Sequence, residues 1–387
     1  MLANSYSSAS AGALTLALVA TLSPARAQEP GPRAAAGVDV QAFSFADPSA
    51  AGSKSVLLVA APFAARLLAL PALSIDALGA YARGSVRDAA GNTLTLSGFT
   101  DTEVRATVPF QGAHNSLALT ARALIPTGLV TMDQDQLAVA GLIASNLLPF
   151  RISTWGVGGG GGGEATATHA GERGSVGATV GYRVSGSFQP LAANAGRYRP
   201  GNEAALRLAA EQTVGGAGNL SLQLSAAQYS NDQWDGAGLL RPGMRIFALG
   251  GYTAPVGAAA AASFYGGALY RSGAALSESG AFAGLLAGAP APPSETLLLA
   301  GGSLRLPWAQ RVLVPALDVR ALSRADGTGQ GWLASLGGSA ELPLGDSGAR
   351  LVPSARVHLG RLLVASGVSS GVTGAELGLG ITFGGAR

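Results

Sequence analysis

The side chains best suited to acid–base or metal chemistry are three histidines, His114, His169 and His358, in a chain without cysteine. None of them stands at a metal-ligand spacing from another histidine or a carboxylate, so we expect no metal site. The lack of cysteine excludes thiolate ligands and a cysteine nucleophile. Ser354 and His358 share one face of an expected strand, but four residues along a strand span about 13 Å, too far for a hydrogen bond. We therefore expect no enzyme and no cofactor.

A larger set of charged side chains lies on the polar face of expected strands, where polar and apolar residues alternate. If these strands cross a membrane as a barrel, a charge on the lipid face would cost about 2–4 kcal/mol, so the set should line the lumen. The charges would either pair and fill the interior, which their near balance favours, or line a pore that selects solutes. The candidate lumen-lining residues are Glu103, Arg105, Arg122, Arg183, Glu203, Arg207, Glu211, Asp318, Arg320, Arg356, His358 and Glu376.

The elements that position these residues are long strands. From about Ser55 onward, residues such as 103–110 (EVRATVPF) and 117–125 (LALTARALI) alternate with a period of two, which predicts strands. Many run for about nine to eleven residues, the length that a tilted strand needs to cross a bilayer. Only 12% of the residues are charged and 48% are apolar. We therefore predict an all-β fold, an antiparallel transmembrane β-barrel of about 14 strands, with 12 to 16 possible.

One segment departs from this period. Residues 131–148 (TMDQDQLAVAGLIASNLL) place Asp133 and Asp135 in a first helical turn, followed by apolar residues. The pattern predicts a short helix in an extracellular loop, with a strand as the alternative.

The N-terminal region divides into two further parts. Residues 1–27 fit a signal peptide, because the apolar run Ala11–Leu22 precedes a small-x-small cleavage site, although no Lys or Arg comes before that run. Residues 28–53, rich in Ala, Gly, Pro and Ser, predict a flexible segment or a small plug, and the barrel would then occupy 54–387. No passenger of useful length precedes the barrel, which disfavours an autotransporter translocator. The net charge of +3 is not clustered, so we expect no nucleic-acid partner.

Three short stretches carry a family resemblance. Residues 98–102 (GFTDT) precede a strand, 125–128 (IPTG) end the next, and 198–202 (YRPGN) lead into another. In these the chain resembles outer-membrane barrels of the phenol meta-pathway transporter type, relatives of fatty-acid and aromatic-hydrocarbon channels. The resemblance implies a monomer in the outer membrane of a Gram-negative-type cell, inserted by the barrel-assembly machinery, that takes up small hydrophobic molecules. The chain departs from the usual pattern by running on past its terminal aromatic Phe383. The alternative is a non-transporting structural or adhesive barrel with a packed lumen.

Six consecutive glycines follow Trp155 in the stretch WGVGGGGGG. No Lys-Ser/Thr pair follows them, which excludes a common nucleotide loop, and the strand pattern on both sides argues against a domain linker. Strand kinks open lateral exits in the related hydrocarbon channels, so the resemblance implies a wall opening here, with a plain hairpin loop as the alternative. The wall-opening candidates are Gly158, Gly159, Gly160, Gly161, Gly162 and Gly163.

Overall fold

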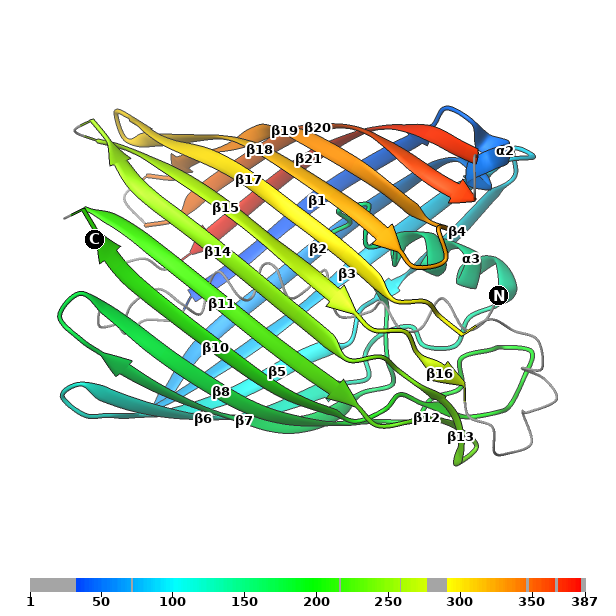
Figure 1. The fold of residues 1–387 in the computed structure, drawn as a ribbon, viewed down its shortest axis with the longest axis horizontal. Coiled ribbons are helices and arrows are strands. Elements are labelled where there is room, and N and C mark those ends of the chain that lie inside the picture. The colour runs from blue at the N-terminus through cyan, green and yellow to red at the C-terminus, as the bar shows by residue number, and fades with distance from the viewer. Residues whose placement is uncertain are drawn as a thin grey trace.

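The structure, a computed structural model, describes residues 33–70, 72–215, 217–257, 259–276, 291–345, 348–365 and 368–383. Antiparallel strands form one continuous sheet that closes where β1 pairs with β21 (Figure 1). The sheet has 17 strands, but β4 and β5 pair with successive parts of β3 and share one place in the wall, so the barrel has 16 strand positions. The predicted closed antiparallel barrel is confirmed, and the expected number of about 14 strands was too low.

The wall strands alternate in direction around the barrel. They are β1 (Arg33–Phe45), β2 (Ser53–Leu70), β3 (Leu73–Asp88), β4 (Thr93–Phe99), β5 (Thr102–Gln111), β6 (Asn115–Ile125), β7 (Gly160–Ala170), β8 (Gly174–Ser185), β10 (Glu203–Val214), β11 (Gly218–Tyr229), β14 (Arg245–Val256), β15 (Ala260–Arg271), β17 (Glu295–Trp308), β18 (Arg311–Arg324), β19 (Gln330–Pro343), β20 (Arg350–Ala365) and β21 (Val368–Phe383).

Strand β1 corrects the expected domain boundary. A flexible segment or plug was expected over 28–53, but Arg33–Phe45 forms a full wall strand with ladders to both β2 and β21. Its first half is mostly Ala and Gly, whose small side chains give little contrast between the two faces, so the period of two is hard to see there. The expected signal peptide, residues 1–27, lies outside the described residues. No helix in the described part of the chain is both long and apolar enough to span a bilayer.

The two ends of the barrel differ in their connections. At one end, here called the turn end, neighbouring strands join through short turns such as 112–114 and 171–173, whereas long connections such as 126–159 and 186–202 lie at the other, the loop end. Figure 1 shows the turn end on the left and the loop end on the right. A short helix, α2 (Pro48–Ala51), joins β1 to β2 at the loop end, where β9 (Tyr198–Arg199), β12 (Asp232–Trp234), β13 (Ala237–Arg241) and β16 (Ala275–Leu276) form a separate small sheet.

The connection between β6 and β7 folds onto the inner face of the wall. This inner segment, residues 126–159, contains α3 (Gln134–Ile143), which confirms the predicted helix. Asp133 caps it in a capping box with Gln136, as its position suggested. The helix packs against β2, β3 and β4 rather than standing free in an outer loop. Val139 and Ile143 join the buried cluster that holds Leu58 of β2, so the core of the molecule lies inside the barrel, between one side of the wall and this segment.

Candidate functional site: the lumen and the inner segment

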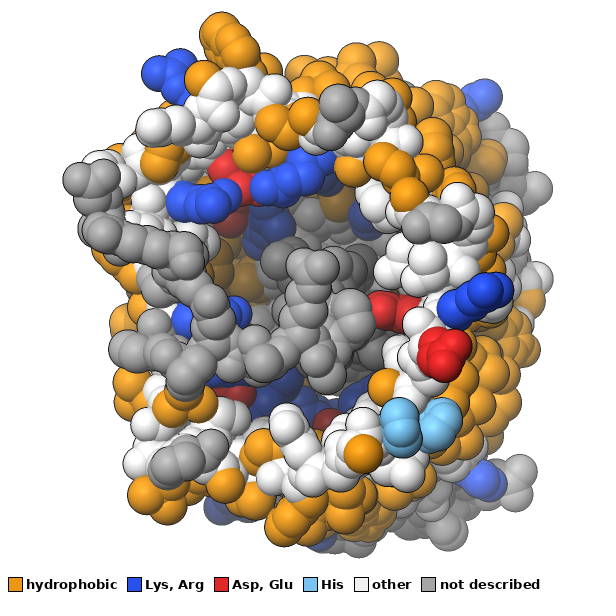
Figure 2. Space-filling view, turned by 90° about the vertical axis from the view of Figure 1, so that its left-hand side faces the viewer, with side chains coloured by type: hydrophobic (Ala, Val, Ile, Leu, Met, Phe, Trp, Pro, Cys, Tyr) orange, Lys and Arg blue, Asp and Glu red, His pale blue; other side chains and the backbone are white. Residues whose placement is uncertain are grey.

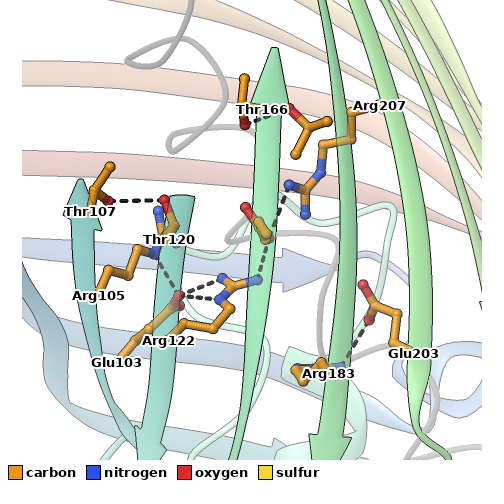
Figure 3. A network of polar contacts seen from close by, with 11 residues as sticks. Glu103, Arg105, Thr107, Thr120, Arg122, Thr166, Arg183, Glu203 and Arg207 are labelled. Atoms are coloured by element: carbon orange, nitrogen blue, oxygen red, sulfur yellow. Dashed lines mark hydrogen bonds and ion pairs between the residues drawn. The ribbon is translucent and has the colours of Figure 1, made fainter. Parts of the chain in front are cut away.

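A chain of ion pairs crosses the inner face of β5, β6, β7 and β10 (Figure 3). Glu103 contacts Arg122 of β6 and Arg105 of its own strand, whose Nε lies 2.6 Å from Glu103 Oε1. Arg122 also reaches Glu164 of β7 at 2.9 Å, and Glu164 contacts Arg207 of β10 at 3.1 Å. Because β8 lies between β7 and β10, Arg207 spans an intervening strand to make this pair. Two carboxylates therefore serve three arginines.

Two other predicted lumen residues of this side pair nearby. Arg183 of β8 and Glu203 of β10 face each other in the ladder, and their side chains meet at 2.9 Å. Glu211 lies on the same face of β10 nearer the turn end, and it joins no ion pair within the described ranges. The alternation of the sequence thus placed these side chains on the inner face, while their partners depend on which strands are neighbours.

The opposite side of the lumen holds the remaining predicted residues. Asp318 of β18 accepts a hydrogen bond from the Tyr265 hydroxyl of β15 and pairs with Arg356 of β20 at 3.2 Å. Arg320 follows on the same face of β18 and is half-buried. One strand, β17, lies between Tyr265 and Asp318, and one strand, β19, lies between Asp318 and Arg356. This cluster therefore also ties together strands that are not adjacent.

Two arginines share one carboxylate near the turn end. Arg305 of β17 and Arg350 of β20 both contact Glu341 of β19, with nitrogen–oxygen distances of 2.7 and 2.5 Å. Both guanidinium groups are half exposed, at 50% and 53% of the side-chain surface. Figure 2 shows basic side chains around the hollow at this end, while apolar side chains cover the outside of the wall.

The sharing of carboxylates recurs around the lumen. Glu103, Glu164 and Glu341 each contact two arginines, and so does Glu295, which lies within 3.2 Å of Arg271. Glu103 and Glu164 share Arg122, so these four carboxylates form three groups, and each group contains one guanidinium more than it has carboxylates. Each group therefore leaves one positive charge facing the lumen. Rings of arginine in a pore favour the passage of anions.

A reversed arrangement fastens the inner segment to the wall. Arg151 of the segment lies between two carboxylates, Asp39 of β1 at 3.4 Å and Glu376 of β21 at 3.1 Å. Beside them the fully buried amide of Gln41 donates to the Pro149 carbonyl at 2.8 Å and accepts from the Arg151 backbone N–H at 2.7 Å. The Gln41 side chain therefore pairs with the backbone of the segment as a neighbouring strand would.

Apolar packing holds the segment along the rest of its length. Trp155 is completely buried, and its indole N–H donates to the carbonyl of Ala82 on β3 at 3.2 Å. Gly84 of β3 lies directly beneath, because a Cβ there would approach Trp155 and Ile143 within 3.1 and 2.5 Å. This inner region of β3 is thus shaped to receive the segment, and the segment narrows the lumen on that side.

Two of the stretches that carried the family resemblance meet where the segment leaves and rejoins the wall. Asp101, from the first stretch, accepts the backbone N–H of Gly128, from the second, at 3.0 Å and that of Val157 at 2.8 Å. Gly128 has no room for a side chain, since a Cβ would lie 2.1 Å from the Trp155 carbonyl oxygen. One carboxylate therefore joins both ends of the inner segment to the junction of β4 and β5.

The six glycines do not open the wall in this structure. Gly160 to Gly163 belong to β7 and pair with β6 on one side and β8 on the other. Gly158 and Gly159 precede the strand with φ near +80°, a conformation that glycine adopts without strain, and Gly160 has φ +150°. Close approach explains part of the run, because a Cβ at Gly162 would lie 2.2 Å from the Tyr182 carbonyl oxygen. The hypothesis of an opening at these residues is corrected: they bring the segment back into a closed ladder.

The discontinuity of the wall lies instead along β4. This strand pairs with β3 but with no strand on its other side among the described residues. Beyond Phe99, whose carbonyl accepts the N–H of Leu129 at 3.2 Å, the inner segment replaces the neighbouring strand. Phe99 itself points outward and is more than half exposed, in edge contact with Tyr81. The open edge is thus bordered by aromatic side chains on the outside and by the inner segment on the inside.

The third stretch of the resemblance organises the small sheet at the loop end. The Tyr198 hydroxyl donates to Asp232 at 2.5 Å, and the backbone N–H of Gly201 donates to the same carboxylate at 2.6 Å. Burial raises the pKa of the Asp232 carboxyl above its ordinary value, although these two hydrogen bonds act in the opposite direction. This carboxylate therefore connects two loops of the barrel, outside the wall strands.

A serine and a histidine on neighbouring strands of the lumen wall lie in contact, and the sequence analysis did not pair them. Ser335 Oγ of β19 lies 2.8 Å from His358 Nδ1 of β20, and His358 Nε2 lies 3.9 Å from Glu376 Oε2. Spacing along the strand places Ser354 too far from His358 for a hydrogen bond, whereas the cross-strand register pairs His358 with Ser335. Both residues are buried, at 4% and 1% exposure, and the ring of Phe43 contacts that of His358. A serine–histidine contact is therefore present, without an open surface beside it.

Sequence reasoning missed several residues that complete the lumen. Most continue the two-residue alternation of a predicted strand, as Glu164 does with Thr166 and Thr168. Extending that alternation along each strand would have assigned them to the inner face. Gln41 lay in the stretch interpreted as flexible, and Arg151 lay in the stretch before the glycines, which was interpreted as a strand. The missed residues are Asp39, Gln41, Arg66, Asp76, Asp101, Arg151, Glu164, Arg271, Glu295, Arg305, Ser335, Glu341 and Arg350.

No family model and no curated protein sequence matches the chain. Among solved structures, it is similar to OccK11 of Pseudomonas aeruginosa, at 13% identity over 92% of this chain and 98% of that one, with a TM-score of 0.44. An outer membrane channel from Pseudomonas putida F1 matches at 12% identity over 94% and 99% of the two chains, with a TM-score of 0.37. A loop-deletion form of OmpT, an outer membrane protein of Vibrio cholerae, matches at 9% identity over 91% and 98%, with a TM-score of 0.42.

The expectation that the chain is no enzyme is corrected. A barrel fold does not by itself exclude catalysis. Ser354 was the one serine weighed as a partner of His358 from sequence, whereas Ser335 Oγ lies 2.8 Å from His358 Nδ1. The more specific resemblance to phenol and fatty-acid transporters is not confirmed by these likenesses. What the structure establishes is a closed antiparallel barrel with a charged lumen and an inward-folded segment.

Proposed function

We propose that the protein is an outer-membrane channel through which small solutes diffuse, and that it prefers anions. The observation that carries the proposal is the repeated sharing of one carboxylate by two arginines, at Glu103, Glu164, Glu295 and Glu341. Apolar outward-facing side chains such as Leu206, Leu222 and Leu377 give the wall a lipid-compatible exterior.

The proposal is tested by the reversal potential in planar bilayers under a potassium chloride gradient. The wild-type channel should conduct, and the sign of the potential should report a preference for chloride. Replacing the pair near the turn end, Arg305→Gln with Arg350→Gln, should reduce that preference. Arg311→Gln is the matched control, since Arg311 lies at the same end with its guanidinium over the ring of Trp308 and contacts none of these carboxylates. A bilayer that stays silent would favour the structural or adhesive barrel with a packed lumen.

A second candidate is the passage of small hydrophobic molecules, which the open edge of β4 favours. Apolar solutes would leave the lumen sideways along the open edge of β4 beside Phe99, next to the point where the inner segment replaces a strand. The chain has no cysteine, so Phe99→Cys offers a single site for a bulky maleimide. Labelling should block uptake of an apolar dye into liposomes and leave ion conductance intact. Unchanged uptake after complete labelling would exclude this route.

A further inference from the structure

The outer face of the wall carries an unusual group of cations near the loop end. Lys54 of β2 and Arg83 and Arg87 of β3 occupy this face, where the other strands present mostly apolar side chains. The Lys54 ammonium lies 3.3 Å from the point where a Cβ on Gly91 would stand, and Arg87 Nε lies 3.4 Å from the Gly91 carbonyl oxygen. Two of the cations therefore converge on the turn between β3 and β4.

These cations are not neutralised by the protein in the way that the lumen arginines are. No carboxylate within the described ranges forms an ion pair with Lys54, Arg83 or Arg87. The nearest acidic residue in the ladder, Asp88, uses its carboxylate to accept the N–H groups of Gly91 and Asn92 at 2.7 and 2.8 Å. The patch keeps a net positive charge when Asp88 is counted.

Hydroxyl groups and backbone donors surround the cations. Thr93, Thr95 and Ser97 of β4 stand beside Arg87, Ser85 and Arg83 in the ladder, and all three are exposed. The carbonyl of Phe99 points away from β3. Alternate residues of an antiparallel strand direct both their N–H and their C=O groups to the same edge. The backbone N–H and C=O groups of Ser97 and Thr95 therefore also point to the open edge of β4. The patch thus combines fixed positive charge with hydrogen-bond donors.

The position of the patch along β3 identifies its surroundings. Toward the turn end, the outer face passes from Arg83 to Tyr81, whose ring contacts Phe99, and then to Gly79, which Phe63 covers. An aromatic pair between an apolar and a polar zone marks the level where hydrocarbon gives way to headgroups. From Arg83 to Arg87 the strand rises by about 13 Å, which spans a headgroup layer.

We propose that this patch, Lys54, Arg83, Arg87, Thr93, Thr95 and Ser97, binds the phosphorylated headgroup of a glycolipid in the membrane leaflet at the loop end. Guanidinium and ammonium groups bind phosphate oxygens, and the hydroxyls and free backbone donors suit the sugar hydroxyls of such a lipid. The inference rests on the membrane location in the proposed function, but it is independent of whether the lumen conducts.

The test uses the full chain in a neutral detergent and measures binding of diphosphoryl lipid A by native mass spectrometry. The triple variant Lys54→Gln, Arg83→Gln, Arg87→Gln should bind it at least tenfold more weakly than the wild type. The control triple variant Arg173→Gln, Arg311→Gln, Arg361→Gln removes the same charge elsewhere and should keep the wild-type affinity. Folding of each variant is checked by heat-modifiable migration on a denaturing gel.

Two further arms separate the possible ligands. Lipid A stripped of its phosphates should bind the wild type as weakly as intact lipid binds the patch variant, and inorganic phosphate alone should not compete at millimolar concentration. Equal affinity of the two triple variants would overturn the proposal, as would full competition by free phosphate. A silent channel that still binds the lipid would leave this inference intact while refuting the channel, so the two failures are distinguishable.

Discussion

Gln41 offers a direct test of how the inner segment is held, because its buried amide pairs with the segment's backbone. Gln41→Ala removes the acceptor of the Arg151 N–H and the donor to the Pro149 carbonyl. The change leaves the remaining Arg151 ion pairs in place. We therefore expect local release of the residues around Arg151 while the barrel stays folded.

The magnitude follows from the two hydrogen bonds. A buried backbone group left without a partner costs about 1–3 kcal/mol. Water that enters the space vacated by the amide offsets part of this, so we take about 2–4 kcal/mol for the pair. Since 1.4 kcal/mol is a factor of ten, the open fraction of this region should rise by roughly 30- to 700-fold.

Trypsin measures this opening, because Arg151 is the one Lys or Arg between Pro126 and Gly159. When opening and closing are faster than cleavage, the cutting rate follows the open population. The cut after Arg151 should therefore accelerate by at least an order of magnitude in Gln41→Ala. Gln41→Glu keeps the size of the side chain and places an oxygen against the Pro149 carbonyl, so it should accelerate the cut as well.

Gln223→Ala is the matched control, since Gln223 lies on the inner face of β11, away from the segment. Its cutting rate after Arg151 should equal that of the wild type. If Gln41→Ala is cut no faster than this control, the reasoning fails, and apolar contacts such as those of Trp155 alone hold the segment.

Three further outcomes are expected. Trp155→Ala removes a completely buried indole and should loosen the segment by about 3–5 kcal/mol, seen as a faster cut after Arg151, and an unchanged rate would contradict the assigned packing. Gly160→Ala should prevent formation of the heat-modifiable folded band, because φ is +150° and a Cβ would lie 2.4 Å from the Val184 carbonyl oxygen. Gly161→Ala is the control and should fold, since the nearest atom to a Cβ there is 3.5 Å away. Because folding raises the pKa of Asp232 above 3.8, the small sheet should lose stability as pH rises through that folded pKa. Hydrogen exchange of residues 232–241, corrected for the intrinsic exchange rate, should then become faster with rising pH in the wild type. An equal pH response in Asp232→Asn would refute the assignment.

The class of fold could be predicted from sequence because one physical rule governs it. Side chains of a strand alternate between lipid and lumen, so Arg122, Arg183 and Arg207 could be assigned to the inner face without knowing any neighbour. Their partners could not be assigned, because Arg207 meets Glu164 across β8, and that contact depends on the register of three strands. The same limit hid the contact of Ser335 with His358.

The inner segment shows a second limit. Its helix was predictable from Asp133 and the apolar residues that follow, but a helix pattern does not say which surface will cover it. A signal was present in β2, where residues 56–61 (VLLVAA) are apolar on both faces and therefore need a partner inside the barrel as well as lipid outside. Considering the two stretches together would have placed α3 in the lumen.

The pairing of β1 with β21 has a consequence for how the molecule assembles. Twelve residue pairs, from Ala34 with Phe383 to Phe45 with Val372, close the sheet. Bringing together segments separated by more than three hundred residues costs about 5 kcal/mol of chain entropy in a flexible chain. Spread over this ladder, that cost is about 0.4 kcal/mol for each pair. A few β1–β21 pairs cannot offset this entropy cost, so the ladder should form in one cooperative step. It should also form late, because it needs β21, the last strand of the sheet. Until then the unpaired edges of the incomplete sheet need another surface to pair with.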